Sequence, residues 1–289
     1  MYDQTSRTLA LAGMALALSS PPCSSAFAAD ASPAAQAPGA GSGVGEWRRI
    51  SVNGMQVNIL LPDGYSTRHK YPVILYLHQL DMGDWPEGLL KEIDPWFNTA
   101  AWRKAYPAIV ISPLLDQKAD PSGKTINFGG VSSDGQPGQD NAVAAVRQIE
   151  EQYSVDRSRI YVTGNSMGGI GTWDIMIKYN AVSGTEDKIF AAGMPLAGAT
   201  YDHGYPMPDP AVVSALRDVP IWAIHGAGDT QVPPVWDKAI AAALAGSKTF
   251  RFTLDPNLAH DVWDTYYAPP VGKDCWDWMF ARKAPRRRR

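Results

Sequence analysis

The sequence has little of what would mark a disulfide scaffold, a membrane protein or a nucleic-acid binder. Only two of its 289 residues are cysteines. Its formal net charge of -3 lacks the basic excess that attracts phosphate backbones, so we expect no nucleic-acid partner. No apolar stretch reaches the roughly 20 residues that a spanning helix needs, and we expect no stable membrane insertion.

The composition is that of a globular protein with a sizeable core. Hydrophobic residues make up 45% of the chain and charged residues 19%, which is far from the disordered class. Once the two ends are set aside, the remaining length suits one α/β domain. We therefore expect a single folded domain over residues 46–285.

The amino terminus has the pattern of an export signal. Arg7 precedes a short apolar run, and the small-residue pattern Ala26-Phe27-Ala28 follows. This arrangement predicts a cleavable signal peptide over residues 1–28 and a secreted or periplasmic protein. A lipid anchor at Cys23 is the alternative, although Pro22 stands where a small residue is expected.

Both flanks of the domain are expected to be unstructured. Residues 29–45 are mostly Ala, Pro, Gly and Ser, which predicts a flexible linker, and residues 286–289 form a basic tail of four arginines. Because Cys23 would leave with the leader, Cys275 has no partner for an internal disulfide. We expect Cys275 to be a buried, unreactive thiol in a carboxy-terminal helix.

Apolar runs alternate with helical patterns through the middle of the chain. Almost continuous apolar runs, typical of strands buried on both faces, occupy residues 72–78, 108–112, 159–163 and 219–225. Further strands are expected at 190–196 and 250–254, and the clearest helical pattern is 141–153. This alternation predicts an α/β fold with a mostly parallel central sheet and helices on both faces.

A different pattern opens the domain. Residues 47–52 and 55–61 flank Asn53-Gly54, a dipeptide that tolerates the positive φ angles of a tight turn. We therefore expect an antiparallel hairpin at the amino-terminal end of the sheet.

The segment Gly164-Asn165-Ser166-Met167-Gly168 follows the strand at 159–163 and precedes a helical pattern. This GxSxG motif lies in the strand-turn-helix context of a nucleophilic serine, because small residues allow the sharp turn that exposes the hydroxyl. The helix that begins there favours the anion that develops in acyl transfer. We predict Ser166 as the nucleophile and the backbone N–H of Met167 as an oxyanion donor.

Asp229 is the predicted acid of a catalytic triad. It follows the strand at 219–225 in a glycine-rich loop, and the order serine, acid, histidine is the one expected for such a sheet. The alternative is a turn aspartate that binds its own backbone. Asp237, in the following helix, and Asp261, next to the histidine, are weaker candidates.

His260 is the predicted general base, since it is the only histidine downstream of Asp229 and histidine exchanges a proton near neutral pH. The backbone N–H of Leu80, in the loop after the strand at 72–78, is the predicted second oxyanion donor. The other histidines lack metal-ligand spacing, and we expect no metal and no cofactor.

Together these motifs resemble the α/β-hydrolase esterases grouped with phospholipase/carboxylesterases, bacterial predicted peptidases and polyhydroxybutyrate-depolymerase-like enzymes. The resemblance covers roughly residues 50–283 and rests on Tyr76-Leu77-His78, Tyr153 to Asp156, Arg159 to Gly169, Gly171 to Asp174, Phe190 to Ala192, Pro220 to Trp222, Gly228-Asp229 with Val232-Pro233, His260 to Trp263 and Trp278 to Phe280. It implies an α/β-hydrolase fold that cleaves carboxylic esters through an acyl-enzyme, with Ser166, Asp229 and His260 as the triad of a catalytic domain.

One position departs from the family pattern. Gln79 stands where the family has glycine after the strand-end histidine. A side chain there clashes with the turn, narrows the acyl pocket or places an amide donor near the oxyanion, and the sequence leaves these alternatives open. Gln79 is therefore a candidate substrate-binding residue.

Besides Trp236, three tryptophans lie in or near the catalytic segments: Trp85, Trp173 and Trp263. Core packing explains most tryptophans, but one beside a triad also stacks on aromatic acyl groups, so we take these three as further candidates for substrate binding. The expected partner is a small-molecule or polymeric ester, with feruloyl esters and polyesters among the candidates. The sequence does not specify the oligomeric state.

Two alternative functions remain open. A serine peptidase or amidase would use the same triad on a different leaving group. A non-catalytic polymer-binding protein would keep the fold and use its tryptophans, although the complete triad argues against it.

Overall fold

The computed structural model describes residues 45–80, 82, 86–115, 128, 138–182, 188–199 and 210–284. The predicted signal peptide, nearly all of the linker, the basic tail and Trp85 lie outside the described residues.

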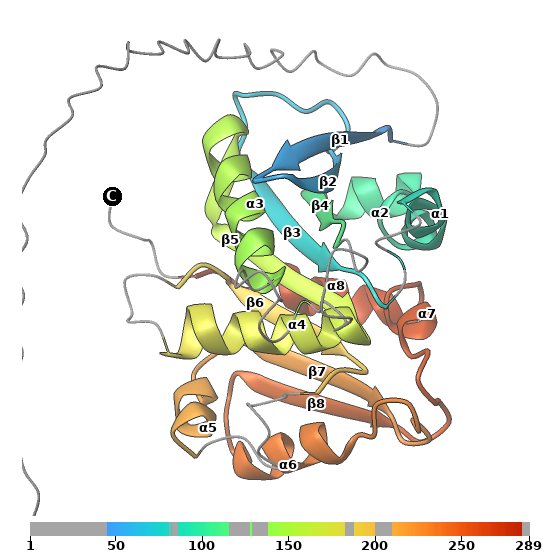
Figure 1. Ribbon diagram of the computed structural model, residues 1–289, viewed down its shortest axis with the longest axis vertical. Coiled ribbons are helices and arrows are strands. Elements are labelled where there is room, and N and C mark those ends of the chain that lie inside the picture. The colour runs from blue at the N-terminus through green and yellow to red at the C-terminus, as the bar shows by residue number, and fades with distance from the viewer. Residues whose placement is uncertain are drawn as a thin grey trace, which may run out of the picture. The chain divides into compact units, whose positions relative to one another are not determined.

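The described residues form an eight-stranded sheet with the order β1-β2-β4-β3-β5-β6-β7-β8 (Figure 1). The strands are β1 (Trp47–Val52), β2 (Met55–Leu60), β3 (Tyr71–Leu77), β4 (Ile109–Pro113), β5 (Val155–Asn165), β6 (Ala192–Leu196), β7 (Ile221–Gly226) and β8 (Phe250–Asp255). β2 is antiparallel to β1 and to β4, and the other neighbouring pairs are parallel. The prediction of a mostly parallel sheet is confirmed.

The amino-terminal hairpin is also confirmed. Val52 pairs with Met55 across the turn, and Asn53 and Gly54 have φ angles of 50 and 83 degrees. Two successive positive φ angles match the right-handed twist of the flanking strands.

The described helices are α1 (Pro86–Phe97), α2 (Ala100–Ala105), α3 (Gly138–Gln152), α4 (Met167–Met176), α5 (Pro210–Leu216), α6 (Val235–Ala243), α7 (Trp263–Tyr266) and α8 (Val271–Phe280). A π-helical turn, η1 (Ile177–Val182), continues α4. None of the helices among the described residues combines the length and the apolar character needed to cross a membrane.

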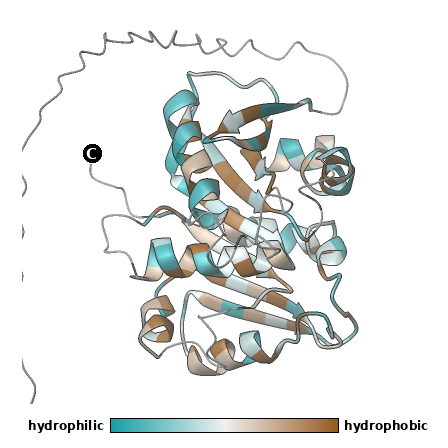
Figure 2. Ribbon diagram, viewed as in Figure 1, coloured by the Kyte–Doolittle hydropathy of each residue, from teal (hydrophilic) through white to brown (hydrophobic). Residues whose placement is uncertain are grey.

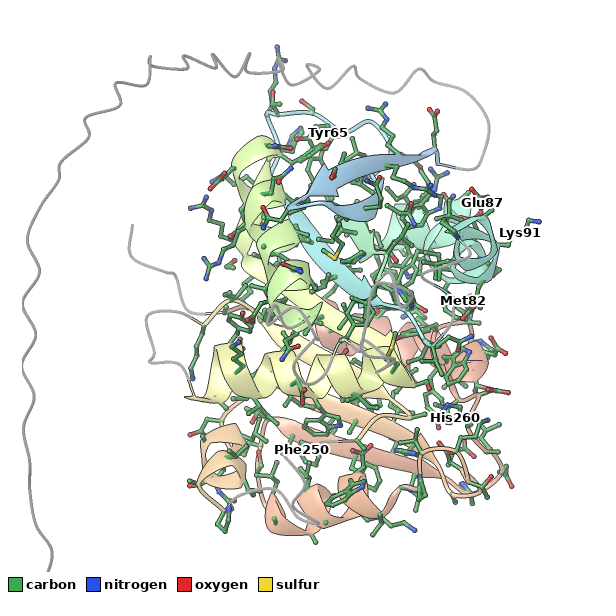
Figure 3. All side chains as sticks on the ribbon, viewed as in Figure 1. Tyr65, Met82, Glu87, Lys91, Phe250 and His260 are labelled. Atoms are coloured by element: carbon green, nitrogen blue, oxygen red, sulfur yellow. The ribbon has the colours of Figure 1, made fainter. Side chains whose placement is uncertain are left out.

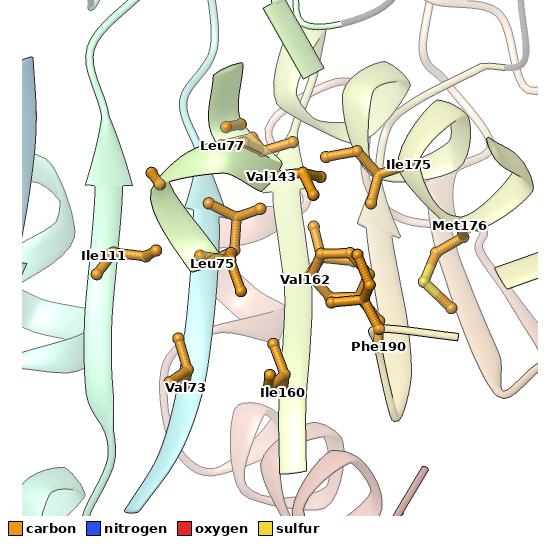
Figure 4. Close-up of a cluster of buried hydrophobic side chains, with 14 of the residues drawn as sticks. Val73, Leu75, Leu77, Ile111, Val143, Ile160, Val162, Ile175, Met176 and Phe190 are labelled. Carbon is orange, nitrogen blue, oxygen red and sulfur yellow. The ribbon is translucent and has the colours of Figure 1, made fainter. Parts of the chain in front are cut away.

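Helices cover both faces of the sheet, because successive residues of a strand point to opposite sides. Val73, Leu75 and Leu77 of β3 pack in one core cluster with side chains of α3, α4, α5 and α6. Figure 4 shows part of this cluster, with Val143 of α3 and Ile175 of α4 beside β3 and β5. Ile74 and Tyr76 of the same strand pack in a second cluster with α1, α2, α7 and α8. Figure 2 shows hydrophobic colour along the central strands, as expected for a sheet buried on both sides.

Cys275 belongs to the second cluster. It lies on α8, is free and fully buried, and burial raises the pKa of its thiol to about 12. The predicted inert thiol is therefore in place.

The carboxyl ends of the parallel strands gather at one edge of the sheet. His260 lies beyond the end of β8, at the opposite end from Phe250, the first residue of that strand (Figure 3). This edge is where α/β sheets bind their ligands.

Candidate active site

Ser166 occupies a strained turn between β5 and α4. Its φ and ψ angles are 53 and -117 degrees, values that are costly for a residue other than glycine. Its N–H donates to the carbonyl of Leu196 on β6 at 3.0 Å, and Met167 opens α4 directly after it. The half-buried Ser166 side chain thus lies at the amino terminus of a helix.

Glycine is required around this turn because three backbone segments nearly touch. A Cβ atom on Gly168 would lie 1.9 Å from the carbonyl oxygen of Leu77, and one on Gly164 would lie 2.5 Å from the same oxygen. Since these neighbours are backbone atoms, no side-chain movement relieves the clash. The structure therefore agrees with the expectation that small residues on either side of Ser166 allow the sharp turn.

The structure brings Ser166, His260 and Asp229 together. Nε2 of His260 lies 2.8 Å from the Ser166 hydroxyl oxygen, and Nδ1 of His260 lies 2.6 Å from Oδ2 of Asp229. His260 and Asp229 are both buried. With the imidazole proton on Nδ1, His260 donates to Asp229 and accepts from Ser166.

Asp229 combines the two alternatives that its sequence left open. Its Oδ1 accepts the backbone N–H groups of Gln231 and Val232, both at 2.9 Å, as a turn aspartate does. Its Oδ2 accepts from His260. Burial raises the pKa of Asp229, but the hydrogen bonds from His260, Val232 and Gln231 outweigh burial and hold it below the usual range.

The weaker candidates for the acid take other positions. Asp261 is exposed. Asp237 is fully buried on α6, where it contacts His225 and Trp173 rather than His260. Among the residues that the structure describes, no group of three or more His, Cys, Asp or Glu side chains is arranged to hold a metal ion.

His78, at the end of β3, orients the peptide that carries the predicted Leu80 donor. Its Nε2 accepts from the N–H of Leu115 at 3.1 Å, so Nδ1 carries the proton and donates to the carbonyl of Gln79 at 2.6 Å. That carbonyl and the Leu80 N–H belong to one planar peptide and point in opposite directions. His78 therefore fixes the direction of the Leu80 N–H, and Leu80 itself is 46% exposed.

The Gln79 side chain is tied to the nucleophile turn and to α1. Its Oε1 accepts from Nδ2 of Asn165 at 3.0 Å, and its Nε2 donates to Glu92 at 3.4 Å. Asn165 in turn accepts from the hydroxyl of Tyr76 at 2.6 Å. Burial and the charge of Asp264 raise the pKa of Glu92 to about 7. The Gln79 amide thus pairs with neighbouring side chains of the protein.

The two described tryptophan candidates differ. Trp263 packs edge-on against His260, with ring centroids 5.2 Å apart. Trp173 is 0% exposed, and its Nε1 donates to Asp237 at 3.0 Å. The substrate-binding prediction for Trp173 is therefore corrected: both faces of α4 are covered, and this side chain belongs to the core.

The first prediction concerns Gly168. We expect Gly168→Ala to lower the free energy of unfolding by about 2 kcal/mol or more, because its Cβ would overlap the Leu77 backbone. Urea unfolding measures this loss. Gly228→Ala is the matched control, since its nearest neighbour would be 3.4 Å away, and equal losses in the two variants would contradict the expected overlap.

The second prediction concerns the pH dependence of stability. Burial lowers the pKa of His78 from 6.5 to about 4, so the unfolded chain takes up a proton between these values while the folded chain does not. Stability from the neutral imidazole is present above pH 6.5 and is lost as the pH falls towards 4, with a total on the order of 3 kcal/mol.

Urea unfolding at several pH values, on the protein and its His78→Gln variant, measures this contribution. Gln offers an acceptor to Leu115 but does not titrate. Between pH 7 and 4 the unfolding free energy should fall more steeply in the unmodified protein than in the variant. Parallel pH profiles would rule out the proposed burial of a neutral His78.

Residues 52–180 match the family described as Putative esterase. This segment contains Ser166 and the β3 loop but neither Asp229 nor His260. No curated protein matches the sequence.

Solved structures share the fold at low sequence identity. A thermostable esterase has a TM-score of 0.58 and 20% identity, with 83% of this chain and 63% of that chain covered, so this chain spans less than two thirds of it. A mutant of the feruloyl esterase module from Clostridium thermocellum, complexed with sinapinate, has a TM-score of 0.60 and 18% identity over 85% of this chain and 92% of that chain. An acylaminoacyl peptidase has a TM-score of 0.54 and 15% identity, covering 85% of this chain and 43% of that chain.

The family match and the shared fold agree with the sheet order and with the position of the GxSxG turn between β5 and α4. The predicted resemblance to esterases is therefore confirmed for residues 52–180, and the α/β fold of the described residues is shared with solved esterases.

Proposed function

We propose that this chain is a serine hydrolase that cleaves carboxylic esters through an acyl-enzyme. The observation that carries the proposal is the continuous line of hydrogen bonds from Ser166 to His260 at 2.8 Å and from His260 to Asp229 at 2.6 Å. Ser166 is also the residue with the strained backbone at a helix amino terminus, which is the arrangement of an activated nucleophile.

In the first half-reaction, the Ser166 oxygen attacks the ester carbonyl carbon while its proton passes to Nε2 of His260. A new carbon–oxygen bond forms, and the carbonyl oxygen becomes an oxyanion. When the intermediate collapses, the bond to the alcohol oxygen breaks. His260 returns its proton to that oxygen, and the acyl group stays on Ser166.

In the second half-reaction, water replaces the alcohol. His260 takes a proton from water as the water oxygen attacks the acyl carbon, and then returns that proton to Ser166 as the free acid leaves. The oxyanion of each step would accept hydrogen bonds from the backbone N–H groups of Leu80 and Met167. The positions of Leu80 after β3 and of Met167 at the start of α4 support this role.

Asp229 would hold the reactive tautomer of the imidazole. Its carboxylate accepts the proton on Nδ1 of His260, which leaves Nε2 free to accept from Ser166. When His260 becomes positively charged, the buried negative charge of Asp229 stabilises it. The two backbone N–H groups on its other oxygen contribute to fixing the orientation of the carboxylate.

Esters with an aromatic acyl group are the first substrates to test. Trp263 packs edge-on against His260 and is 6% exposed, so an aromatic edge borders the proposed base without offering an open stacking face. A neighbour in fold is a feruloyl esterase module complexed with sinapinate, which supports including hydroxycinnamate esters.

The third prediction tests the nucleophile. We expect measurable hydrolysis on a panel of p-nitrophenyl acyl esters, methyl ferulate, methyl sinapate and an insoluble polyester. Ser166→Ala should lower kcat by at least about 10³-fold, because the variant has no atom that can carry the acyl group. Circular dichroism and the melting temperature serve as controls for folding.

A serine-directed phosphonate gives a readout that does not depend on the substrate. It should modify the protein once, at Ser166, with no modification in Ser166→Ala. Matched p-nitroanilide substrates separate esterase from amidase activity, and faster turnover of the anilides would favour the peptidase alternative. Full activity in Ser166→Ala would refute the proposed nucleophile, and absence of both turnover and labelling would favour a non-catalytic protein.

A further inference from the structure

A second histidine–aspartate pair lies behind the triad carboxylate. His225, at the end of β7, has its Nε2 3.1 Å from Oδ2 of Asp229 and its Nδ1 2.8 Å from Oδ2 of Asp237 on α6. The side chains of His225 and Asp237 are both 0% exposed. Burial of two titratable groups is costly unless each is paired, so this pair needs an explanation.

The hydrogen-bond partners fix one proton of His225. Its Nε2 also lies 2.8 Å from the backbone carbonyl of Val232. Since a carbonyl oxygen accepts only, Nε2 must carry a proton, and Asp229 lies within reach of the same proton. His225 therefore acts as a donor toward the triad.

The second ring nitrogen is held by Asp237. One proton is shared between Nδ1 of His225 and Oδ2 of Asp237, while the other oxygen of Asp237 accepts from Nε1 of Trp173 at 3.0 Å. Burial by itself lowers the pKa of His225, but the hydrogen bond and charge of Asp237, the Val232 carbonyl and the charge of Asp229 raise it above its ordinary value. Asp229 and Asp237 are the charged groups that face His225 from the loop after β7 and from α6.

The Asp229 carboxylate thus has four donors. Gln231 and Val232 donate to Oδ1, and His260 and His225 donate to Oδ2. A carboxylate whose two oxygens are filled in this way stays ionised and cannot rotate without breaking several bonds. The donors from Gln231, Val232 and His225 fix the orientation of the carboxylate, so that its Oδ2 faces His260.

We propose that His225 is a positioning residue for the reaction: Asp237 holds it as a hydrogen-bond donor, and it keeps Asp229 ionised and turned toward His260. The line of contacts then runs from the core to the nucleophile through Trp173, Asp237, His225, Asp229, His260 and Ser166. This inference rests on the proposed triad mechanism, but it assigns a task to two buried residues that the triad mechanism leaves unused.

The test uses two double variants of equal charge. In His225→Gln/Asp237→Asn, the Gln amide nitrogen replaces Nε2 as the donor to Asp229, and the Asn amide pairs with the Gln oxygen and with Trp173. In His225→Leu/Asp237→Asn, that donor is missing. Because Asn replaces Asp in both, neither variant has an unpaired buried charge on α6.

We expect kcat of the Leu variant to be about 10- to 100-fold below that of the Gln variant, with KM changed by less than about 3-fold. The reason is that only the Leu variant lets the carboxylate move. Equal kcat values in the two double variants would overturn the inference, whatever their melting temperatures.

The single variant Asp237→Asn tests the charge of the pair. Its Oδ1 still accepts from Trp173, and its Nδ2 donates to Nδ1 of His225, which leaves His225 neutral with its Nε2 proton in place. Asp229 then has one less positive charge beside it, so the acid limb of the pH profile of kcat/KM should move to higher pH by at least about half a pH unit. An unchanged profile would show that His225 carries no positive character.

A control is needed for the effect of lower stability on kcat. Tyr161→Phe removes a partly buried hydrogen bond, from the Tyr161 hydroxyl to the carbonyl of Arg282 at 3.0 Å, on the other face of the sheet. It should lower the melting temperature and leave kcat and the pH profile unchanged. A comparable fall in kcat for Tyr161→Phe would mean that the His225 effect reflects destabilisation and would overturn the inference.

One readout is independent of turnover. The proton of the 2.6 Å bond between His260 and Asp229 should give a strongly deshielded NMR signal in the unmodified protein and in the Gln variant, and a shifted or broadened signal in the Leu variant. If no ester is hydrolysed, the proposed function fails while this signal still decides the role of His225. If Ser166→Ala abolishes turnover and the two double variants keep identical signals, only the inference about His225 fails.

Discussion

The backbone turn at Ser166 determines how closely β3, β5, β6 and α4 must pack around it. A serine held at φ 53 and ψ -117 degrees carries a cost of about 1–3 kcal/mol, and the surrounding pairings must offset it. β5 pairs with β3 on one side and β6 on the other, and Leu196 accepts the Ser166 N–H. Gly168 touches the Leu77 backbone so closely that β3, β5 and α4 admit one arrangement. The half-buried Ser166 side chain stays at this edge of the sheet because the core around it allows no other turn.

The same sheet order gathers the remaining groups. β3, β5, β7 and β8 end at one edge, so the loops that follow them meet there. The last two loops are joined directly, since the Gly228 N–H donates to the carbonyl of Leu258 at 3.0 Å and a Cβ on Gly226 would lie 1.9 Å from the carbonyl of Ala259. The loop that carries His260 is thereby held against the loop that carries Asp229. The short distance between these two side chains follows from backbone contacts next to them.

The elements that sequence predicted best are those with a local physical signature. Apolar runs identified the parallel strands, and Asn53-Gly54 identified the hairpin turn. β5 starts at Val155, earlier than the predicted run at 159–163. Val155 pairs with Tyr71, and the register then shifts. The residues that follow Val155 are polar, so the apolar pattern did not predict this first part of the strand.

Side-chain environments were harder to predict. Trp173 was expected near substrate, but α4 is buried on nearly all sides, so its sequence has no polar face that would have shown which way the side chain points. The pairing of His225 with Asp237 had no signal either. It depends on how α6 packs, because Asp237 lies 12 residues after His225, and Asp237 looked like an ordinary residue of the first helical turn. Sequence order predicted that Ser166, Asp229 and His260 lie together because order reflects topology, whereas the contacts behind Asp229 depend on packing.

Two buried histidines at strand ends show how environment decides the role of one residue type. His78 contacts the Leu115 N–H and the Gln79 carbonyl, which are neutral, and burial lowers its pKa to about 4. His225 lies between two carboxylates, and their hydrogen bonds and charges raise its pKa despite burial. A neutral histidine suits the orientation of a peptide N–H, because it adds no charge beside that peptide. A histidine with a raised pKa is suited to contact with carboxylates, because both of its ring N–H groups can donate. In His225 these groups face the buried Oδ2 atoms of Asp229 and Asp237.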